Sequence, residues 1–239
     1  MIIAALLLAA APPAGAVAIT SDRDGLSFAY GWPREAEAVP ALSRRFRADA
    51  AAQKKRMMDL VAGEKAFRAE QKLDFNGLDF SRQYELYGQS RQLLSLVNAT
   101  AAYTGGAHPN SGTKALLWER RLGRDITYAN LLSPRQSWDG AIRQPFCVLL
   151  DRERAKRRQE PVKRADWPAQ CPQLKELTVA LADKDKDGRF DHVDVLADPY
   201  VAGPYAEGGY EISLPITATM IGRLKPGYRA DFKAQPPVQ

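Results

Sequence analysis

Residues 93–120, LLSLVNATAAYTGGAHPNSGTKALLWER, decide how this chain folds. Two β-compatible runs, 93–104 and 113–120, flank a loop rich in glycine and proline, which is the pattern of a β-hairpin. The last part of the chain contains an apolar/polar alternation typical of a half-buried strand. Working outward from the hairpin, we expect further strands at residues 26–30, 80–87, 177–181, 190–196 and 210–216.

Two helices accompany these strands. Apolar residues recur at three- and four-residue steps between Val39 and Phe67, which predicts a long helix over residues 40–72. A second helix is expected to begin at Ser133-Pro134, to be kinked or split at Pro145, and then to become basic. Because helices and strands mix without a regular βαβ alternation, we expect an α+β fold. Its antiparallel sheet would carry the long N-terminal helix and the second, basic helix.

The beginning of the chain has the pattern of a secretory signal peptide. Residues 2–11 are apolar, and two small-residue cleavage patterns follow, at residues 14–16 and 16–18. We therefore expect residues 1–18 to be a signal peptide and residues 19–239 to form a single domain. No later stretch reaches the roughly 20 apolar residues that cross a bilayer. The predicted location is periplasmic or secreted.

The two cysteines and the charge distribution agree with an exported protein. Cys147 and Cys171 are the only cysteines, and an oxidising compartment favours their pairing in a disulfide worth roughly 3 kcal/mol. The alternative is two free, buried thiols. Residues 143–164 hold eight basic and three acidic residues. This stretch is interpreted as a solvated helix end, with a surface for anionic wall polymer or lipid head groups as the alternative.

An acidic stretch, residues 183–194, has the spacing of a calcium loop. Gly188 falls at the sixth position, where the loop turns sharply, and an aspartate rather than a glutamate fills the twelfth. The sequence predicts a structural Ca²⁺ ion, and the alternative is a surface turn of solvated aspartates. Asp191 would occupy the ninth position, and the expected ligands are Asp183, Asp185, Asp187, the carbonyl of Arg189, and Asp194.

Signatures of catalysis are weak in this sequence. It contains no metalloprotease, nucleophile-elbow or phosphate-loop motif. Glu207 and Glu211 could flank a sugar as the carboxylates of a glycosidase do, but nothing fixes their separation. His108 could transfer a proton or contact a ligand, and the alternative is a polar turn residue.

Two patches resemble a bacterial envelope domain of unknown function. Tyr103-Thr104-Gly105-Gly106-Ala107-His108 is similar to a hallmark of the N-terminal module of a peptidoglycan N-acetylglucosamine deacetylase. Residues 203–208 and 224–228 resemble the companion half. The same pair of halves forms the extracellular part of a lysozyme-sensing anti-sigma factor, so the chain resembles a PdaC/RsiV-like domain over roughly residues 80–232.

The resemblance implies a function in binding rather than catalysis. It implies an exported, non-catalytic module that binds or senses cell-wall glycan or a wall-lytic enzyme. The partner would be peptidoglycan or a lysozyme-like protein and not a nucleic acid. A small peptidoglycan-active hydrolase with carboxylates or His108 in its site is the alternative. The chain carries neither the deacetylase domain nor the sigma-binding part, so neither parent activity is expected to carry over whole. Candidate ligand-binding residues are Tyr103, Thr104, Gly105, Gly106, His108, Tyr205 and Glu207.

Overall fold

The computed structural model describes residues 14–162 and 170–237, and its chain forms two compact units. Unit 1 comprises the residues up to Gln83 together with Ala102–His108, and unit 2 comprises Tyr84–Ala101 and Pro109–Gln239. Most of the expected signal peptide lies outside the described residues. Its last two residues, Val17 and Ala18, belong to the first strand.

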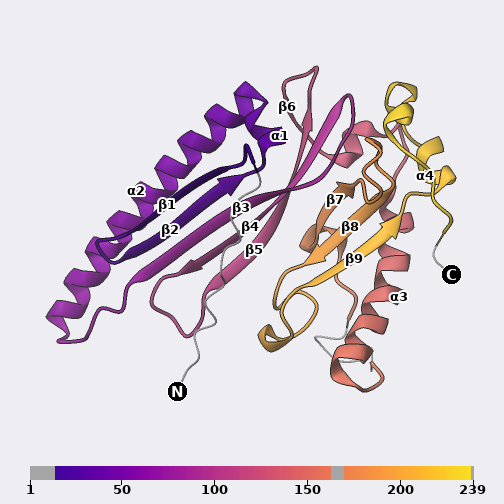
Figure 1. Ribbon diagram of the computed structural model, residues 1–239. Coiled ribbons are helices and arrows are strands. Elements are labelled where there is room, and N and C mark those ends of the chain that lie inside the picture. Colours follow the sequence, from indigo (N-terminus) through magenta and orange to yellow (C-terminus); the bar gives the residue numbers. More distant parts are fainter. Residues whose placement is uncertain (1–13, 163–169, 238–239) are drawn as a thin grey trace. The chain divides into compact units, whose positions relative to one another are not determined.

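Unit 1 is a small sheet covered by a long helix. It contains β1 (Val17–Arg23), β2 (Leu26–Trp32), α1 (Arg34–Glu37), α2 (Pro40–Glu70) and the first half of β3 (Leu78–Gln89). The strands β1 and β2 form an antiparallel hairpin, whereas β2 and β3 are parallel. Helix α2 runs along β1 and β2 (Figure 1) and buries Leu42, Phe46, Ala50, Met57 and Val61.

Unit 2 contains the remaining strands and helices. The six-stranded sheet has the order β1-β2-β3-β4-β5-β6, and β3 and β4 contribute residues to both units. The separate three-stranded sheet β7-β8-β9 is antiparallel. The strands are β4 (Leu93–Tyr103), β5 (Asn110–Glu119), β6 (Arg124–Ile126), β7 (Thr178–Ala182), β8 (His192–Ala197) and β9 (Tyr210–Pro215).

Helix α3 (Asp139–Arg158) packs on β9 and closes the core of unit 2 (Figure 1). Its Trp138 cap, Phe146 and Leu150 are fully buried, and the Trp138 indole donates to the Met220 carbonyl at 3.0 Å. The shorter helices are η1 (Tyr128–Leu131), η2 (Leu174–Glu176), η3 (Tyr205–Glu207), α4 (Ala218–Gly222) and η4 (Pro226–Asp231).

The α+β class, the long helix and the basic helix are confirmed, but the strand arrangement differs from the expected one. The strands form two sheets, and β2 and β3 are parallel because the chain returns to the sheet through α2, as in a βαβ unit. Helix α3 also begins later than Ser133, whose amide instead donates to the Arg223 carbonyl at 2.9 Å. Pro145 lies inside α3 without splitting it.

The predicted disulfide is present, with the Cα atoms of Cys147 and Cys171 5.5 Å apart. Within the described ranges, no helix combines the length and apolar character needed to cross a membrane.

Candidate functional site

A loop in unit 2 exposes Tyr200 in an unusual backbone conformation, beside the half-buried Tyr205. We name residues 198–209, which join β8 to β9, the tyrosine loop. It opens with a turn in which the Val201 amide donates to the Asp198 carbonyl at 3.0 Å. Pro199 occupies the second position of this turn, and Tyr200 the third, with φ +72°. Proline followed by positive φ is the pattern of a type II turn, whose third position normally holds glycine.

Tyr200 therefore sits in a conformation that its side chain disfavours. The left-handed region costs a non-glycine residue about 1 kcal/mol or more. The side chain is also half-exposed, at 51%, so burial of the ring does not explain its presence. The ring lies 5.6 Å from the ring of Tyr205, tilted by 36°. Backbone strain at an exposed aromatic residue suggests that the ring has a function, such as contact with a ligand.

The start of the tyrosine loop is fixed to β5. Both carboxylate oxygens of Asp198 accept from the Thr113 amide at 3.0 Å, and one of them also accepts from the Thr113 hydroxyl at 2.9 Å. The Tyr205 hydroxyl reaches the Pro109 carbonyl at 3.4 Å, just before the same strand. The turn that carries Tyr200 is consequently held on a rigid element.

Arginines of α3 fix the rest of the loop. The buried Arg154 guanidinium donates to the Ala202 carbonyl at 2.8 Å. Arg157 donates to the Glu207 and Gly209 carbonyls at 2.8 and 2.9 Å, and its guanidinium lies 3.9 Å from the centre of the Tyr210 ring. Arginines of the basic helix thus hold the patch at residues 203–208 in place through hydrogen bonds to its backbone.

Glu207, an expected ligand-binding residue, has a carboxylate that is bonded to neighbouring side chains. Its carboxylate accepts two hydrogen bonds from Arg158, at 2.8 and 2.9 Å, and one from the Tyr210 hydroxyl. The hydrogen bonds from Arg158 lower the pKa of Glu207, partial burial opposes this, and the bond from Tyr210 lowers it further. A Cβ atom at Gly203 would displace the Glu207 carboxylate from this position, so glycine allows the carboxylate to keep its hydrogen bonds.

The same geometry separates the two carboxylates of the hydrolase hypothesis. Glu207 bonds to Tyr210, which faces the core side of β9. Glu211 is the next residue and points to the opposite side, because strand side chains alternate, and it accepts from the Tyr87 hydroxyl at 3.4 Å. A glycosidase needs its two carboxylates to flank one bond. Glu207 and Glu211 do not form such a pair.

The first expected motif lies in unit 1. Gly105 has φ +97°, and a Cβ atom there would lie 3.3 Å from the Glu64 carboxylate and 3.4 Å from the Arg68 guanidinium on α2. Glu64 and Arg68 are themselves bonded at 2.6 Å. This glycine therefore serves turn geometry and close packing on the helix. Tyr103 and His108 are half-buried, whereas Thr104 and Gly106 are exposed.

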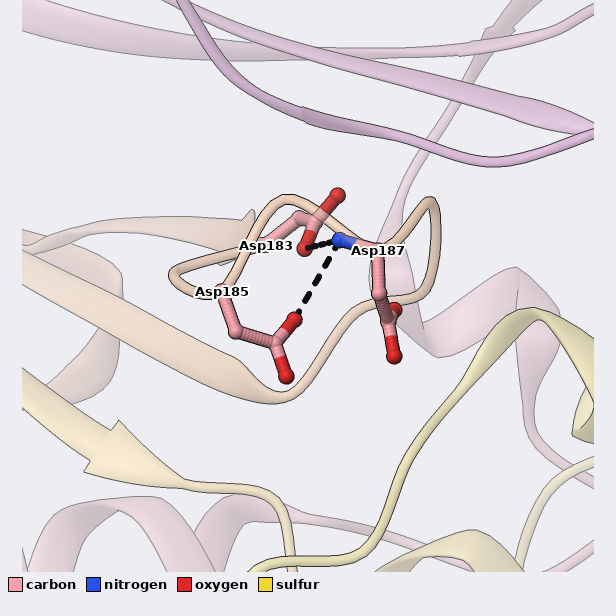
Figure 2. Close-up of side chains that lie close together, drawn as sticks. All are labelled: Asp183, Asp185 and Asp187. Carbon is pink, nitrogen blue, oxygen red and sulfur yellow. Dashed lines mark hydrogen bonds between the residues drawn. The ribbon is translucent and has the colours of Figure 1, made fainter.

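The acidic loop brings three of its expected ligands together, and Figure 2 shows them converging. The carboxylates of Asp183, Asp185 and Asp187 lie within 4.8 Å of one another. The Lys233 ammonium pairs with Asp185 and, at 3.0 Å, with Asp187. The bond from Lys233 lowers the pKa of Asp185, and the bonds from Arg189 and Lys233 lower that of Asp187 to about 2.

Another expected ligand, Asp194, is used differently. Asp194 is fully buried on β8 and pairs with the Lys184 ammonium rather than joining the three aspartates. The Arg189 side chain pairs with Asp187 at 2.7 Å. The side chains of Lys184, Arg189 and Lys233 thus neutralise part of the negative charge of the acidic loop.

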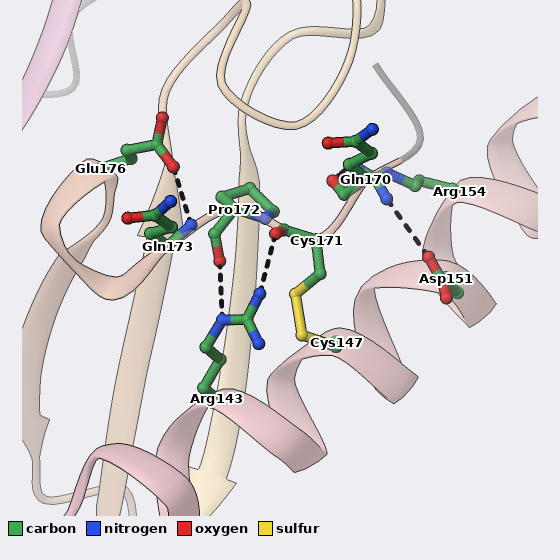
Figure 3. Close-up of a disulfide and its surroundings, with 9 residues drawn as sticks. All are labelled: Arg143, Cys147, Asp151, Arg154, Gln170, Cys171, Pro172, Gln173 and Glu176. Carbon is green, nitrogen blue, oxygen red and sulfur yellow. Dashed lines mark hydrogen bonds and ion pairs between the residues drawn. A yellow bond between two sulfur atoms is a disulfide. The ribbon is translucent and has the colours of Figure 1, made fainter. Parts of the chain in front are cut away.

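The disulfide fixes the segment that returns from α3 towards β7 (Figure 3). Arg143 donates to the carbonyls of Cys171 and Pro172 at 3.2 and 3.3 Å. Arg154 adds a bond to the Gln170 carbonyl at 3.2 Å and one to Asp151 at 3.2 Å. The basic surface that was the alternative interpretation of this stretch is therefore partly engaged in internal contacts. Lys163 and Arg164, also counted in it, lie outside the described residues.

Sequence reasoning missed Tyr200, Asp198 and Arg154. A signal for Tyr200 existed, since Pro199-Tyr200 places an aromatic residue after a proline in a glycine-rich turn region. Arg154 carries no such signal, because a basic residue in a basic helix does not reveal which guanidinium is buried.

Comparison with known proteins supports the fold. No protein-family model matches the chain, and no curated protein matches it. Among solved structures, the chain is similar to a DUF3298 family protein from Pseudomonas aeruginosa PAO1, with a TM-score of 0.58 and 17% identity. It is also similar to a DUF3298 family member from Bacteroides fragilis NCTC 9343, with a TM-score of 0.57 and 14% identity. Each alignment covers 92% of this chain and 97% of the other.

The chain thus shares its fold with proteins of a domain family of unknown function. At these identities the likeness concerns the fold alone.

Proposed function

We propose that this protein is an exported binding module that recognises cell-wall glycan through the tyrosine loop. The observation that carries the proposal is Tyr200, an exposed aromatic residue held in a left-handed turn position beside Tyr205. Export is proposed from the signal-peptide pattern of residues 1–18, and the disulfide is compatible with it. The glycan class comes from the resemblance to wall-associated modules.

The chemistry of a tyrosine pair suits a sugar. A pyranose ring has an apolar face of C–H groups that packs on an aromatic face, whose quadrupole is negative. Tyrosine supplies this contact area with few rotatable bonds and adds a hydroxyl that can bond to sugar hydroxyls. The anchors at Asp198, Arg154 and Arg157 support the idea, because a site held rigidly before binding loses less entropy on binding.

The first experiment is cosedimentation of the mature protein with purified peptidoglycan sacculi, with the supernatant assayed for released sugar. We expect protein in the pellet and no released sugar. Tyr200→Gly is the sharpest variant, because it removes the ring while placing in the turn the residue that its backbone prefers. It should abolish pelleting and leave the fold intact. Phe67→Ala removes an aromatic side chain of similar exposure, 54%, from α2 and should pellet normally.

Each other outcome has a defined meaning. Pelleting that survives in both Tyr200→Gly and Tyr205→Ala would refute the tyrosine loop as the site. Release of sugar would support the hydrolase hypothesis instead. If the protein ignores sacculi but binds a lysozyme-like protein, the partner is the enzyme rather than the glycan, as the resemblance to the anti-sigma factor also allows.

We also propose that the acidic loop binds calcium in a structural role. Convergence of Asp183, Asp185 and Asp187, with Gly188 at φ +85°, supports it. An incoming ion would have to compete with Lys233, which already contacts two of the three carboxylates. This ion would have no part in glycan binding.

A further inference from the structure

The chain contains four asparagines, Asn76, Asn98, Asn110 and Asn130, and only Asn76 is followed by glycine. Asparagine is chemically labile in water, because its side-chain amide can react with the backbone nitrogen of the next residue. A glycine in that next position has no Cβ atom to hinder the approach. Asn76-Gly77 is therefore the dipeptide in which this reaction meets the least steric hindrance.

The structure leaves both reacting groups of this dipeptide accessible. Asn76 is exposed, in a segment of unit 1 without regular structure between α2 and β3. Across the described ranges, no hydrogen bond involves the Asn76 side chain or the Gly77 amide. A Cβ atom placed on Gly77 would meet one heavy atom within 4 Å, the carbonyl oxygen of Gly25 at 3.5 Å. The side-chain carbonyl of Asn76 can thus approach the Gly77 nitrogen without breaking a hydrogen bond.

The other asparagines lack this combination of features. Asn98 is buried on β4, and the side-chain oxygen of Asn130 accepts from the Thr127 amide at 2.8 Å. Asn110 is exposed like Asn76, but it begins β5 and precedes a serine. Asn110 is therefore the matched reference for the reaction at Asn76.

We propose that Asn76 is a site of spontaneous deamidation, and that one of the products weakens the start of β3. The Gly77 nitrogen attacks the side-chain carbonyl carbon of Asn76 and forms a C–N bond. The side-chain nitrogen leaves as ammonia, taking the proton of the Gly77 amide, and a cyclic imide remains. Water then opens the imide at either of its carbonyls. One product is aspartate, and the other is isoaspartate, in which the main chain runs through the side-chain carbon and is longer by that carbon.

The longer main chain of isoaspartate would disturb the contact that fixes the start of β3. The Leu78 amide donates to the Gly25 carbonyl at 2.9 Å, and Leu78 is paired with Leu26 in the parallel register of β2 and β3. Phe75 is fixed on the other side of the dipeptide, because its ring lies against Gly25 and 5.3 Å from the Lys65 ammonium. An extra backbone carbon between these two fixed residues has to be absorbed within a few bonds, and the hydrogen bond of Leu78 is the nearest contact that can give way.

The test incubates the mature protein in a mildly alkaline buffer and measures conversion at each asparagine by peptide mass mapping. We expect Asn76 to convert about tenfold faster than Asn110, which corresponds to a barrier about 1.4 kcal/mol lower. Acidic species should accumulate in the wild type and in the matched control Asn110→Gln. They should be largely lost in Asn76→Gln, because a glutamine would have to close a larger ring. Equal conversion at the two asparagines, or an Asn76 that stays intact, would overturn the proposal.

The structural effect is tested on the isoaspartate form after its chromatographic separation. Its reference is the Asn76→Asp variant, which carries the same charge on a main chain of normal length. Hydrogen exchange of the Leu78 amide should be about tenfold faster in the isoaspartate form than in this variant. Equal exchange in the two proteins would refute the effect on β3. This inference does not depend on glycan binding by the tyrosine loop.

Discussion

Replacement of Arg154 by methionine should destabilise unit 2 far more than its place in a basic helix suggests. The guanidinium is fully buried and donates to the carbonyls of Ala202 and Gln170 and to Asp151. Exchanging a buried ion pair for apolar side chains is often harmless, but here two acceptors are backbone carbonyls that remain after the exchange. Ala202 is also fully buried, so water cannot replace the lost donor.

The expected loss follows from these contacts. The unsatisfied buried carbonyl of Ala202 costs roughly 1–3 kcal/mol, whereas water can reach the carbonyl of the exposed Gln170. Loss of the bond to Asp151 adds to this, giving about 3 kcal/mol. With an m-value of about 2.5 kcal/mol/M, the urea midpoint should fall by about 1.2 M. Tryptophan fluorescence can follow the transition, because Trp138 lies in the same core. Lys156→Met, at an exposed position of the same helix, should change stability by less than about 0.5 kcal/mol. If the unfolding free energies of the Arg154→Met and Lys156→Met variants differ by less than about 1 kcal/mol, the reasoning is refuted.

Four further predictions concern single positions. Tyr200→Gly should be more stable than Tyr200→Ala by about 1 kcal/mol in urea unfolding, because only glycine accepts φ +72° without strain. At the control position Val148, inside α3, the alanine variant should instead be more stable than the glycine variant. If Tyr200→Ala is at least as stable as Tyr200→Gly, the turn is not strained. The pKa of Glu207 is lowered in the folded state, so its contribution to stability is present above the unfolded pKa of about 4.3 and disappears at lower pH. Melting temperature should therefore fall less steeply below about pH 5 in Glu207→Gln than in the wild type, and parallel curves would argue against this role. If residues 1–18 direct export, cleavage after Ala16 leaves β1 whole, since β1 begins at Val17. Mass spectrometry of the exported protein should then show Val17 as the first residue, and a start at Ile19 would mean that β1 is shortened. Millimolar calcium should raise the melting temperature relative to a chelator, and more so in Lys233→Gln, because Lys233 occupies Asp185 and Asp187. No change in either protein would remove the calcium proposal.

Local patterns in the sequence predicted most of the elements. The three- and four-residue apolar spacing located α2, expected at 40–72 and found at Pro40–Glu70. Alternation located β9, and the glycine-rich loop located the hairpin of β4 and β5. These signals are local, because each depends on which side chains face the core of one element.

Features that depend on distant partners were not predictable in this way. The parallel pairing of β2 with β3 depends on where the chain lies after α2, and no residue in either strand encodes it. Ser133 has the chemistry of a helix cap, yet its amide pairs with Arg223, 90 positions later, and the helix begins after Ser137 instead. In both cases a tertiary contact overrides the local preference.

The basic stretch of α3 shows why charge counts alone mislead about function. Its excess of positive charge suggested a surface for anionic polymers as one alternative. Arg143, Arg154 and Arg157 instead direct hydrogen bonds at backbone carbonyls, and Arg158 is held by Glu207. Guanidinium groups suit this task because their donors are fixed in a plane and remain charged when partly buried. Much of the charge therefore positions the tyrosine loop, and recognition by this unit should depend on aromatic contact more than on ionic strength.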